Sequence, residues 1–354
     1  MTTIPTIGLL GHGRFGAALA SLLDQQGLAW CAWDPAAPVP SAHAVDGPAG
    51  LAARARLIVV GVPLDAFGDA LRALRPHLDA GHEVLDVCSV KEHPCRWMDE
   101  LLGDAVGHAG THPLFGPLSI ARAEPLRAVL CPSPRHPGTA ILARALFAAL
   151  GCEVLEQAPA AHDRAMAITH AMAFFVARGL VDLGVGEDLR WAPPSFAALA
   201  ASLAAVRADA GHLFQAIQRQ NPYAAATRRQ FIDALDRIDR RLLEDPDPVA
   251  AGSVGPGAAS PVAEWGAPTP ALQETRALID ELDRELVALL RRRTTLSLRA
   301  AQAKRESGAP VLDPGRELAL MAERRAWALE AGLPAEAVAE VFRDILALSR
   351  RAQA

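Results

Sequence analysis

The sequence predicts an α/β domain followed by two all-α domains, with a linker before the last one. A glycine-rich turn between an apolar strand and a helix opens the chain, and short apolar runs then alternate with helical patterns. Apolar residues next recur at helical spacing, before a segment rich in proline, glycine and serine that has no periodic pattern. We therefore place the domains at residues 1–155, 156–245 and 271–354, and the linker at residues 246–270.

The composition is that of a globular protein of 354 residues, with 51% hydrophobic and 21% charged residues. A net charge of −5 argues against a nucleic-acid-binding surface. The five cysteines form no C-x-x-C pair, which is typical of reduced thiols in the cytoplasm and not of disulfides or a metal site. Because we find neither a signal-peptide pattern nor a run of about 18 apolar residues, we expect a cytoplasmic protein that does not enter a membrane.

Residues 6–26 predict the nucleotide-binding turn of a Rossmann domain. A buried strand leads into Gly-His-Gly-Arg-Phe-Gly and then an apolar helix, which is the context that a G-x-G-x-x-G motif requires. The first glycine is expected to form the tight turn, the second to let the backbone approach a pyrophosphate, and the third to let helix and strand pack closely. A glycine turn in an α/β domain without a nucleotide is the less favoured alternative. The cofactor-binding residues expected here are Gly11, His12, Gly13, Arg14, Phe15 and Gly16.

A carboxylate after the second predicted strand favours NAD over NADP. Asp34 follows the strand at residues 29–33, about 20 residues after the glycines, where a ribose-binding carboxylate is expected. It would accept a hydrogen bond from the ribose 2′-hydroxyl and repel a 2′-phosphate, so we predict NAD as the cofactor. Val62 and Pro63 follow the next strand and are expected at the same site, because ligands bind beyond the C-terminal ends of parallel strands.

Further strands are predicted at residues 83–87, 128–130 and 153–155, flanking helical patterns. Ser89 follows the first of these strands. A role in the site and a role as a helix N-cap are both compatible with its position.

The segment Gly110–Pro117 holds one imidazole, that of His112, between two glycines and two prolines. Pro113 biases His112 away from helical geometry, so we interpret the segment as a stiff loop that presents the histidine and not as a mid-strand. A fixed, exposed imidazole is a natural proton acceptor near neutral pH. On this segment alone, a tight turn with a surface histidine is equally compatible.

The middle of the chain predicts apolar helices at residues 160–183, 195–206, 208–219 and 224–243. His170 lies on an apolar face, where a core histidine is favoured over a ligand contact. His162 beside Asp163 fits either a helix start or part of a site.

These motifs together resemble the prephenate dehydrogenase family over about residues 5–240. The resemblance rests on the glycine turn, on residues 61–63, 86–91 and 111–117, and on His162–Met166, which is similar to the entry of that family's helical domain. It implies oxidation of prephenate by NAD with loss of carbon dioxide, in an interlocked homodimer.

The resemblance also implies residue roles. His112 would accept the hydroxyl proton as the C=O group forms, and Ser89 would hydrogen-bond near that hydroxyl or the nicotinamide. The family usually has an arginine that binds a substrate carboxylate. A gapless comparison places Ala205 there, and Arg207 is the nearest candidate. A related enzyme acting on 4-amino-4-deoxyprephenate would have much the same motifs.

Residues 272–306 predict one long helix, which at 1.5 Å per residue would measure about 50 Å and would pack against a partner chain. Two more helices are predicted at residues 316–331 and 335–353. Arg293 and Lys304 lie three turns apart on one face, and Ser349 and Gln353 share a face of the last helix. On spacing alone, the charged face of a coiled coil is favoured over a site.

The polar positions of residues 272–353 resemble those of the all-helical chorismate mutase. The resemblance implies that Arg276 of a partner chain and Arg293 bind carboxylates, while Lys304 and Gln353 donate to the ether oxygen. Such a site needs neither a nucleophile nor a metal, because fixed cations in a dry bundle stabilise the charge that develops as the C–O bond breaks. The other implied substrate contacts are Asp313, Arg316, Glu317 and Ser349.

We therefore predict a bifunctional enzyme on the route to tyrosine, which converts chorismate to prephenate and prephenate to 4-hydroxyphenylpyruvate. One alternative is the same pair of reactions on the 4-amino analogues. Another is a dehydrogenase whose last domain serves dimerisation or regulation without turnover.

Overall fold

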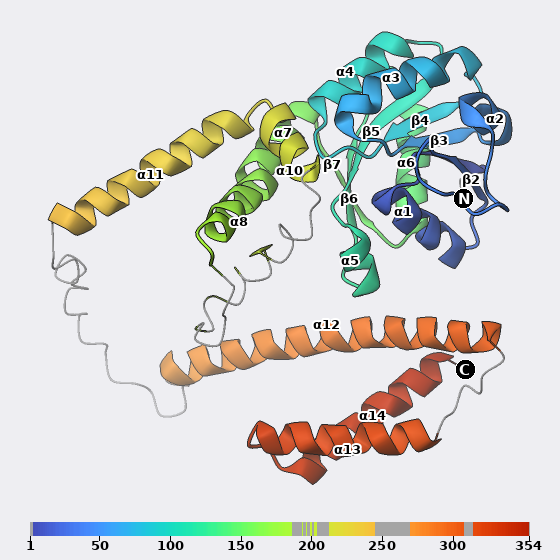
Figure 1. Ribbon diagram of the computed structural model, residues 1–354. Coiled ribbons are helices and arrows are strands. Elements are labelled where there is room, and N and C mark those ends of the chain that lie inside the picture. Colours follow the sequence, from blue (N-terminus) through green and yellow to red (C-terminus); the bar gives the residue numbers. More distant parts are fainter. Residues whose placement is uncertain are drawn as a thin grey trace. The chain divides into compact units, whose positions relative to one another are not determined.

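The computed structural model describes residues 3–185, 193, 196, 199, 202–203, 212–244, 270–307 and 314–353 (Figure 1). Two compact units divide the chain, Met1–Leu118 with Pro125–Ser253, and Ser119–Glu124 with Val254–Ala354. Most of the predicted linker, most of the helix expected at residues 195–206, and the expected site residues Arg207 and Asp313 lie outside the described residues.

The first unit contains a seven-stranded sheet of order β2-β1-β3-β4-β5-β6-β7. Its strands are β1 (Ile7–Leu10), β2 (Trp30–Trp33), β3 (Leu57–Val60), β4 (Glu83–Asp86), β5 (Gly107–Pro113), β6 (Arg127–Cys131) and β7 (Glu153–Glu156). Neighbouring strands are parallel except β5 and β6, which run antiparallel. The strand order reverses beside β1, which is where a doubly wound sheet binds its ligand.

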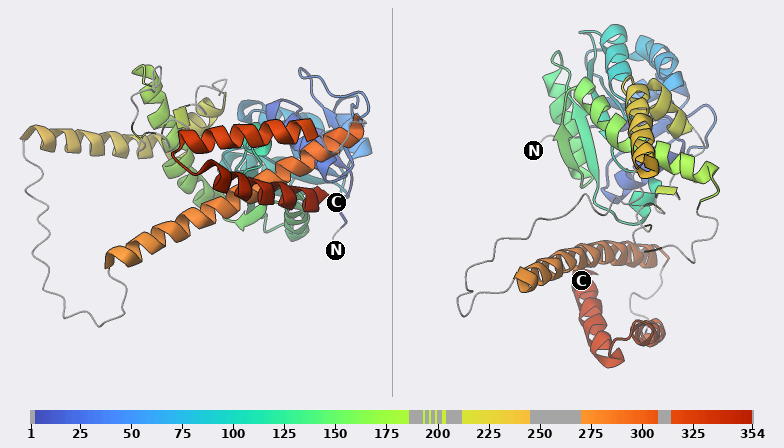
Figure 2. Two further views of the ribbon diagram at one scale, coloured as in Figure 1. Left: turned by 90° about the horizontal axis from the view of Figure 1, so that it is seen from below. Right: turned by 90° about the vertical axis from the view of Figure 1, so that its left-hand side faces the viewer.

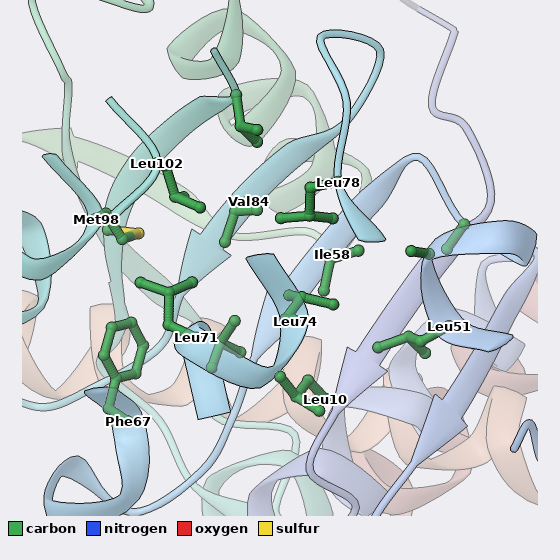
Figure 3. Close-up of a cluster of buried hydrophobic side chains, with 14 of the residues drawn as sticks. Leu10, Leu51, Ile58, Phe67, Leu71, Leu74, Leu78, Val84, Met98 and Leu102 are labelled. Carbon is green, nitrogen blue, oxygen red and sulfur yellow. The ribbon is translucent and has the colours of Figure 1, made fainter. Parts of the chain in front are cut away.

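The helices of this domain are α1 (Arg14–Gln25), α2 (Gly47–Arg54), α3 (Leu64–Leu74), α4 (Glu92–Leu101), α5 (Pro117–Ala121) and α6 (Pro137–Ala149). One core joins a face of the sheet to α2, α3 and α4 through Leu10, Ile58, Phe67, Leu71 and Met98 (Figure 3). Leu9 and Val59 alternate with the first two and are also buried, so both faces of the sheet are covered. This explains why the strands are apolar at nearly every position.

The expectation of a loop at His112 is wrong, because His112 lies in strand β5 and is buried. The pairing of β5 with β4 ends at Gly110 opposite Asp86. The antiparallel strand β6 continues the ladder, and it places His112 opposite Val129. The histidine therefore extends beyond the end of its parallel neighbour while its backbone is still held by the sheet.

Among the described residues, two continuous runs make up most of the helical part of the first unit. The first comprises α7 (Pro159–Met166), the π-helical turn η2 (Ala167–Ala171) and α8 (Met172–Asp182). The second comprises α10 (His212–Gln215) and the π-helical turn η4 (Ala216–Gln220), and it is followed by α11 (Ala224–Glu244). The two π-helical turns contact each other, and such turns occur frequently at functional sites.

Among the described residues, the run Pro159–Asp182 meets the length and composition of a membrane span. The expectation that the chain has no such run is therefore wrong on these two criteria. The finding is weak support for a membrane contact, because the core helix of a soluble protein meets the same criteria. This run also carries the buried polar pair His162 and Asp163.

Apart from Ser119–Glu124, the described part of the second unit comprises α12 (Pro270–Glu306), α13 (Pro314–Glu330) and α14 (Ala335–Gln353), close to the predicted helices. Helix α14 packs against both α12 and α13 (Figure 2). Several leucines of α12 stay more than half exposed, among them Leu278, Leu282 and Leu289. An α/β domain followed by all-α segments confirms the predicted fold class.

Candidate active sites

The glycine turn after β1 has the geometry of a phosphate-binding turn. Gly11 has a φ of 105°, and a Cβ atom on it would lie 2.7 Å from the carbonyl oxygen of Gly61. A Cβ atom on Gly16 would overlap the carbonyl oxygen of Gly11. In contrast, a Cβ atom on Gly13 would meet nothing within 4 Å. Two of the glycines are therefore required by packing, while the third leaves open space at the N-terminus of α1, where an anion is stabilised.

The carboxylate of Asp34 ties the end of β2 to this turn. Its Oδ2 accepts a hydrogen bond from the backbone N–H of His12 at 2.7 Å, and its Oδ1 accepts from Ala36 at 2.8 Å and Ala37 at 2.7 Å. Burial raises the pKa of Asp34, but these three backbone donors outweigh it and leave the pKa below its usual value. Asp34 is therefore ionised at neutral pH and has a fixed orientation.

The segment after β3 lies against the glycine turn. The backbone N–H of Gly61 donates to the carbonyl oxygen of Leu10 at 2.8 Å, and Val62 contacts the space beside Gly11. Pro63 then precedes the first residue of α3. These positions are compatible with the expected place of Val62 and Pro63 in a nucleotide site.

His112 begins a chain of buried polar groups that crosses from the sheet to the helical part. Its Nδ1 lies 2.8 Å from Nε2 of His162, and Nδ1 of His162 lies 2.8 Å from Oδ1 of Asp163. The three side chains are 4%, 1% and 0% exposed. Burial holds the pKa of His112 well below 6.5, and the nearby His162, Lys91 and His170 lower it further. His112 is therefore a neutral base at physiological pH.

Asp163 also holds the start of α4. Its Oδ1 accepts from the backbone N–H of Lys91 at 2.7 Å, and its Oδ2 accepts from that of Glu92 at 2.9 Å. The side chain of Asn221 donates to the carbonyl oxygen of Asp163 at 2.8 Å. One acidic residue thus joins the α/β domain to the helices that follow it.

A buried ion pair lies behind His112. The ammonium group of Lys91 binds the carboxylate of Asp86 and the carbonyl oxygen of Thr111, and both charged side chains have no exposed surface. Burial lowers the pKa of Lys91, but Asp86, Cys88 and Cys95 together raise it above its usual value, so Lys91 stays protonated. Cys88 donates its backbone N–H to Asp86 at 2.9 Å. This pair fixes the end of β4 against β5 next to His112.

The ring of His170 lies close to the ring of His112. It belongs to the π-helical turn η2, and its ring centroid is 6.3 Å from that of His112, with the ring planes 19° apart. The ring of Phe174 packs edge-on against His170 at 5.0 Å. Ser89, the other predicted member of this site, is half-buried between β4 and α4.

The second unit brings some of the predicted polar residues together. Arg293 on α12 donates to the hydroxyl of Ser349 on α14, and Ser349 donates to the carbonyl oxygen of Ile345 at 3.0 Å. Gln353 donates to the carbonyl oxygen of Ser297 at 3.0 Å. These contacts place Arg293, Ser349 and Gln353 at one crossing of α12 and α14.

The other predicted residues of this unit are more exposed. Lys304 is half-buried, Arg276 and Arg316 are exposed, and Glu317 pairs with Arg350 at 2.9 Å. The sequence did not single out Arg324, whose guanidinium lies 4.2 Å from the ring centroid of Trp327. Burial lowers the pKa of Arg293, and the positive charge of Arg324 lowers it further. An anion beside Arg293 would relieve this repulsion.

Comparison with known families gives two matches in different parts of the chain. Residues 42–152 match the family described as prephenate dehydrogenase, nucleotide-binding domain. Residues 275–354 match the family described as chorismate mutase type II.

Three relatives cover different parts of the chain. A "probable arogenate/prephenate dehydrogenase" of Methanocaldococcus jannaschii is 24% identical over 190 residues, which are 51% of this chain and 42% of that protein. The T-protein of Haemophilus influenzae is 38% identical over 76 residues, 22% of this chain and 20% of that protein. A 4-amino-4-deoxyprephenate dehydrogenase of Streptomyces pristinaespiralis is 28% identical over 204 residues, 55% of this chain and 68% of that protein. The chain thus spans less than half the length of the first two relatives.

A solved structure has a similar fold. The crystal structure of prephenate dehydrogenase from A. aeolicus, in complex with hydroxyphenyl propionate and NAD+, matches with a TM-score of 0.58 at 16% identity. The match covers 71% of this chain and 94% of that chain. At this level of identity the similarity concerns the fold.

Proposed function

Because residues 42–152 match the nucleotide-binding domain of prephenate dehydrogenase and residues 275–354 match type II chorismate mutase, we propose that the chain catalyses two successive reactions. The second unit rearranges chorismate to prephenate. The first unit oxidises prephenate to 4-hydroxyphenylpyruvate with loss of carbon dioxide, on the route to tyrosine. The observation that carries the proposal is that one chain holds both a buried neutral imidazole, in a sheet that also bears a glycine turn, and a helix crossing with a semi-buried arginine.

The residues of the glycine turn and Asp34 fit NAD. The open space at Gly13 and the N-terminus of α1 would hold the pyrophosphate, and the ionised Asp34 would accept from a ribose hydroxyl. NAD, when bound, supplies the acceptor for the hydride. A 2′-phosphate would be repelled by Asp34, so we expect a preference for NAD over NADP.

His112 takes the proton in the proposed dehydrogenase reaction. When hydride leaves the carbinol carbon of prephenate, the hydroxyl group must lose its proton as the C=O group forms. A neutral imidazole accepts that proton, and burial keeps His112 neutral. Ser89 would orient the hydroxyl or the nicotinamide, and Arg207 remains the proposed partner of a substrate carboxylate.

The proposed mutase reaction uses fixed positive charge. Chorismate carries two carboxylates, and negative charge builds on its ether oxygen as the C–O bond breaks. Arg293, with Arg276 of a second chain, would bind the carboxylates, while Lys304 and Gln353 would donate to the ether oxygen. Ser349 and Gln353 are already held at the crossing with α12, which supports a preorganised site.

We further propose a cytoplasmic homodimer. The exposed leucines of α12 and the exposed apolar residues Leu235, Ile238 and Leu242 of α11 support burial against a second copy. The free cysteines support a reducing compartment.

A single assay tests the proposal. The full-length protein is given chorismate and NAD, and both NADH and 4-hydroxyphenylpyruvate are followed. We expect NADH and 4-hydroxyphenylpyruvate to form in equal amounts. Loss of chorismate without formation of NADH would support the mutase activity alone and contradict the proposed dehydrogenase activity.

The 4-amino series is the second candidate. It is favoured by the similarity to a 4-amino-4-deoxyprephenate dehydrogenase over 55% of this chain. Parallel assays with prephenate and 4-amino-4-deoxyprephenate distinguish the two, because the preferred substrate has the higher kcat/KM.

A further inference from the structure

The orientation of Asp163 is fixed from three directions. Both carboxylate oxygens accept backbone N–H groups at the start of α4, those of Lys91 and Glu92. The carbonyl oxygen of Asp163 is held by Asn221. The two backbone donors leave both carboxylate oxygens of Asp163 acting as hydrogen-bond acceptors. Asp163 is therefore an acceptor that cannot turn away from His162.

This acceptor determines the protonation of two histidine rings. Since Oδ1 of Asp163 already accepts the backbone N–H of Lys91, it is an acceptor toward His162, which donates to it from Nδ1 at 2.8 Å. In a neutral His162 ring, Nε2 then carries a lone pair. This Nε2 lies 2.8 Å from Nδ1 of His112, so His112 must donate from Nδ1. The remaining nitrogen of His112, Nε2, is left without a proton.

We propose that Asp163, acting through His162, is a positioning residue that holds His112 in the tautomer whose Nε2 accepts the substrate proton. The proposal rests on the dehydrogenase function proposed above. The proton leaves the substrate hydroxyl and binds Nε2 of His112, whose Nδ1–H still donates to His162.

Other titratable groups face this chain. Lys91, on the start of α4, is paired with Asp86 at the end of β4. His170, on η2, stacks at 6.3 Å from His112. The ammonium group of Lys91 lies outside the hydrogen-bond chain that fixes the tautomer, since it binds Asp86 and Thr111.

The tautomer is measured directly on the full-length protein. We label histidine with 15N, record long-range 15N–1H correlation spectra at pH 7.5, and assign His112 by the signal lost in His112→Gln. We expect a protonated Nδ1 and a bare Nε2 at His112. A protonated Nε2 at His112 in the wild-type protein overturns the proposal, whatever the dehydrogenase activity is.

The variant Asp163→Asn presents an amide donor in place of an acceptor. We expect His162 and His112 to reverse their tautomers, and kcat for prephenate oxidation to fall by about 10²- to 10⁴-fold with the KM for NAD unchanged. A fall in kcat with an unchanged His112 tautomer means a merely structural role and overturns the proposal. The matched control is Asp99→Asn, which changes a carboxylate 3.0 Å from Nε2 of another buried histidine, His108, and should leave kcat unchanged.

A second pair of variants tests the proposal if Asp163→Asn does not fold. His162→Gln places an amide oxygen near the position of Nε2, where it can accept from His112, while His162→Leu cannot. We expect Gln to keep the protonated Nδ1 of His112 and a higher kcat than Leu. Equal kcat values for the two variants overturn the proposal. If the wild-type protein does not oxidise prephenate, the proposed function fails while the 15N spectra still decide the tautomer.

Discussion

The ring of Phe15, in the glycine turn, lies 6.1 Å from the ring of Phe115, three residues after His112. Phe15 belongs to the first turn of α1, and Phe115 follows the last residue of β5. The two rings therefore bring the N-terminus of α1 to the same edge of the sheet as His112. A dinucleotide on the turn and a base on β5 would then face one substrate.

Replacement of His112 by asparagine should lower kcat for prephenate oxidation by about 10²-fold or more, because asparagine cannot take up the hydroxyl proton. The Kd for NAD, measured by fluorescence titration, should stay within about twofold, since His112 is not part of the glycine turn. The exposed His77 supplies the control, and His77→Asn should behave like the wild-type protein. Near-normal turnover in the His112→Asn variant would show that His112 is not the base.

The dehydrogenase should keep its activity into the acidic range. Since burial and the neighbouring His162, Lys91 and His170 hold the pKa of His112 well below 6.5, the base is already neutral at pH 6.5. As pH falls through the lowered pKa, His112 takes up a proton and kcat/KM should decrease tenfold per pH unit. Above that pKa the profile should be flat. A decrease that begins at or above pH 6.5 would contradict a buried neutral His112.

Asp34→Asn should weaken NAD binding and reduce the preference for NAD over NADP. The carboxylate accepts three backbone donors and would also accept a ribose hydroxyl, and asparagine loses the charge that strengthens these bonds. We expect the KM for NAD to rise about 10- to 100-fold. Asp46→Asn, an exposed change in the same domain, is the control. A wild-type enzyme that prefers NADP would show that the assignment is wrong.

Arg293→Ala should lower chorismate mutase kcat by about 10²-fold or more, because it removes a cation held at the crossing of α12 and α14. The same variant should oxidise added prephenate at the wild-type rate, which tests whether the first unit is intact. Arg291→Ala changes an exposed arginine of the same helix and should leave both reactions unchanged. Equal mutase rates for the two variants would show that Arg293 is not part of the mutase site.

The fold was predictable because its signals are local. Strand, glycine turn and helix follow one another within 26 residues, and the long apolar and charged periodicities of α11 and α12 mark helices whatever their partners are. The conformation of His112 was predicted wrongly as a loop because Pro113 was taken as a strand breaker. Pro113 is tolerated as the last residue of β5, where the next ladder bond is donated by Leu114 to Arg127.

The polar network around His112 was only partly predictable, because its members are distant in sequence. Asp163 and Lys91 are 72 residues apart, and Asn221 is another 58 residues beyond Asp163. No spacing rule connects such positions. The adjacent His162 and Asp163 were visible as a pair, and the lysine five residues after Asp86 was the available signal for the buried ion pair. His170 was interpreted as a core residue, because a π-helical turn cannot be anticipated from apolar spacing.

The reversal of direction at β6 affects how this enzyme can diversify. A catalytic group on a surface loop can be repositioned by insertions, but His112 is paired with Val129 of β6, and an added residue in β5 would shift that pairing. Changes of specificity should therefore accumulate in the helical segments that face the histidine and spare the strand that bears it. To obtain a new substrate specificity, those helices should be randomised while β5 and β6 are kept unchanged.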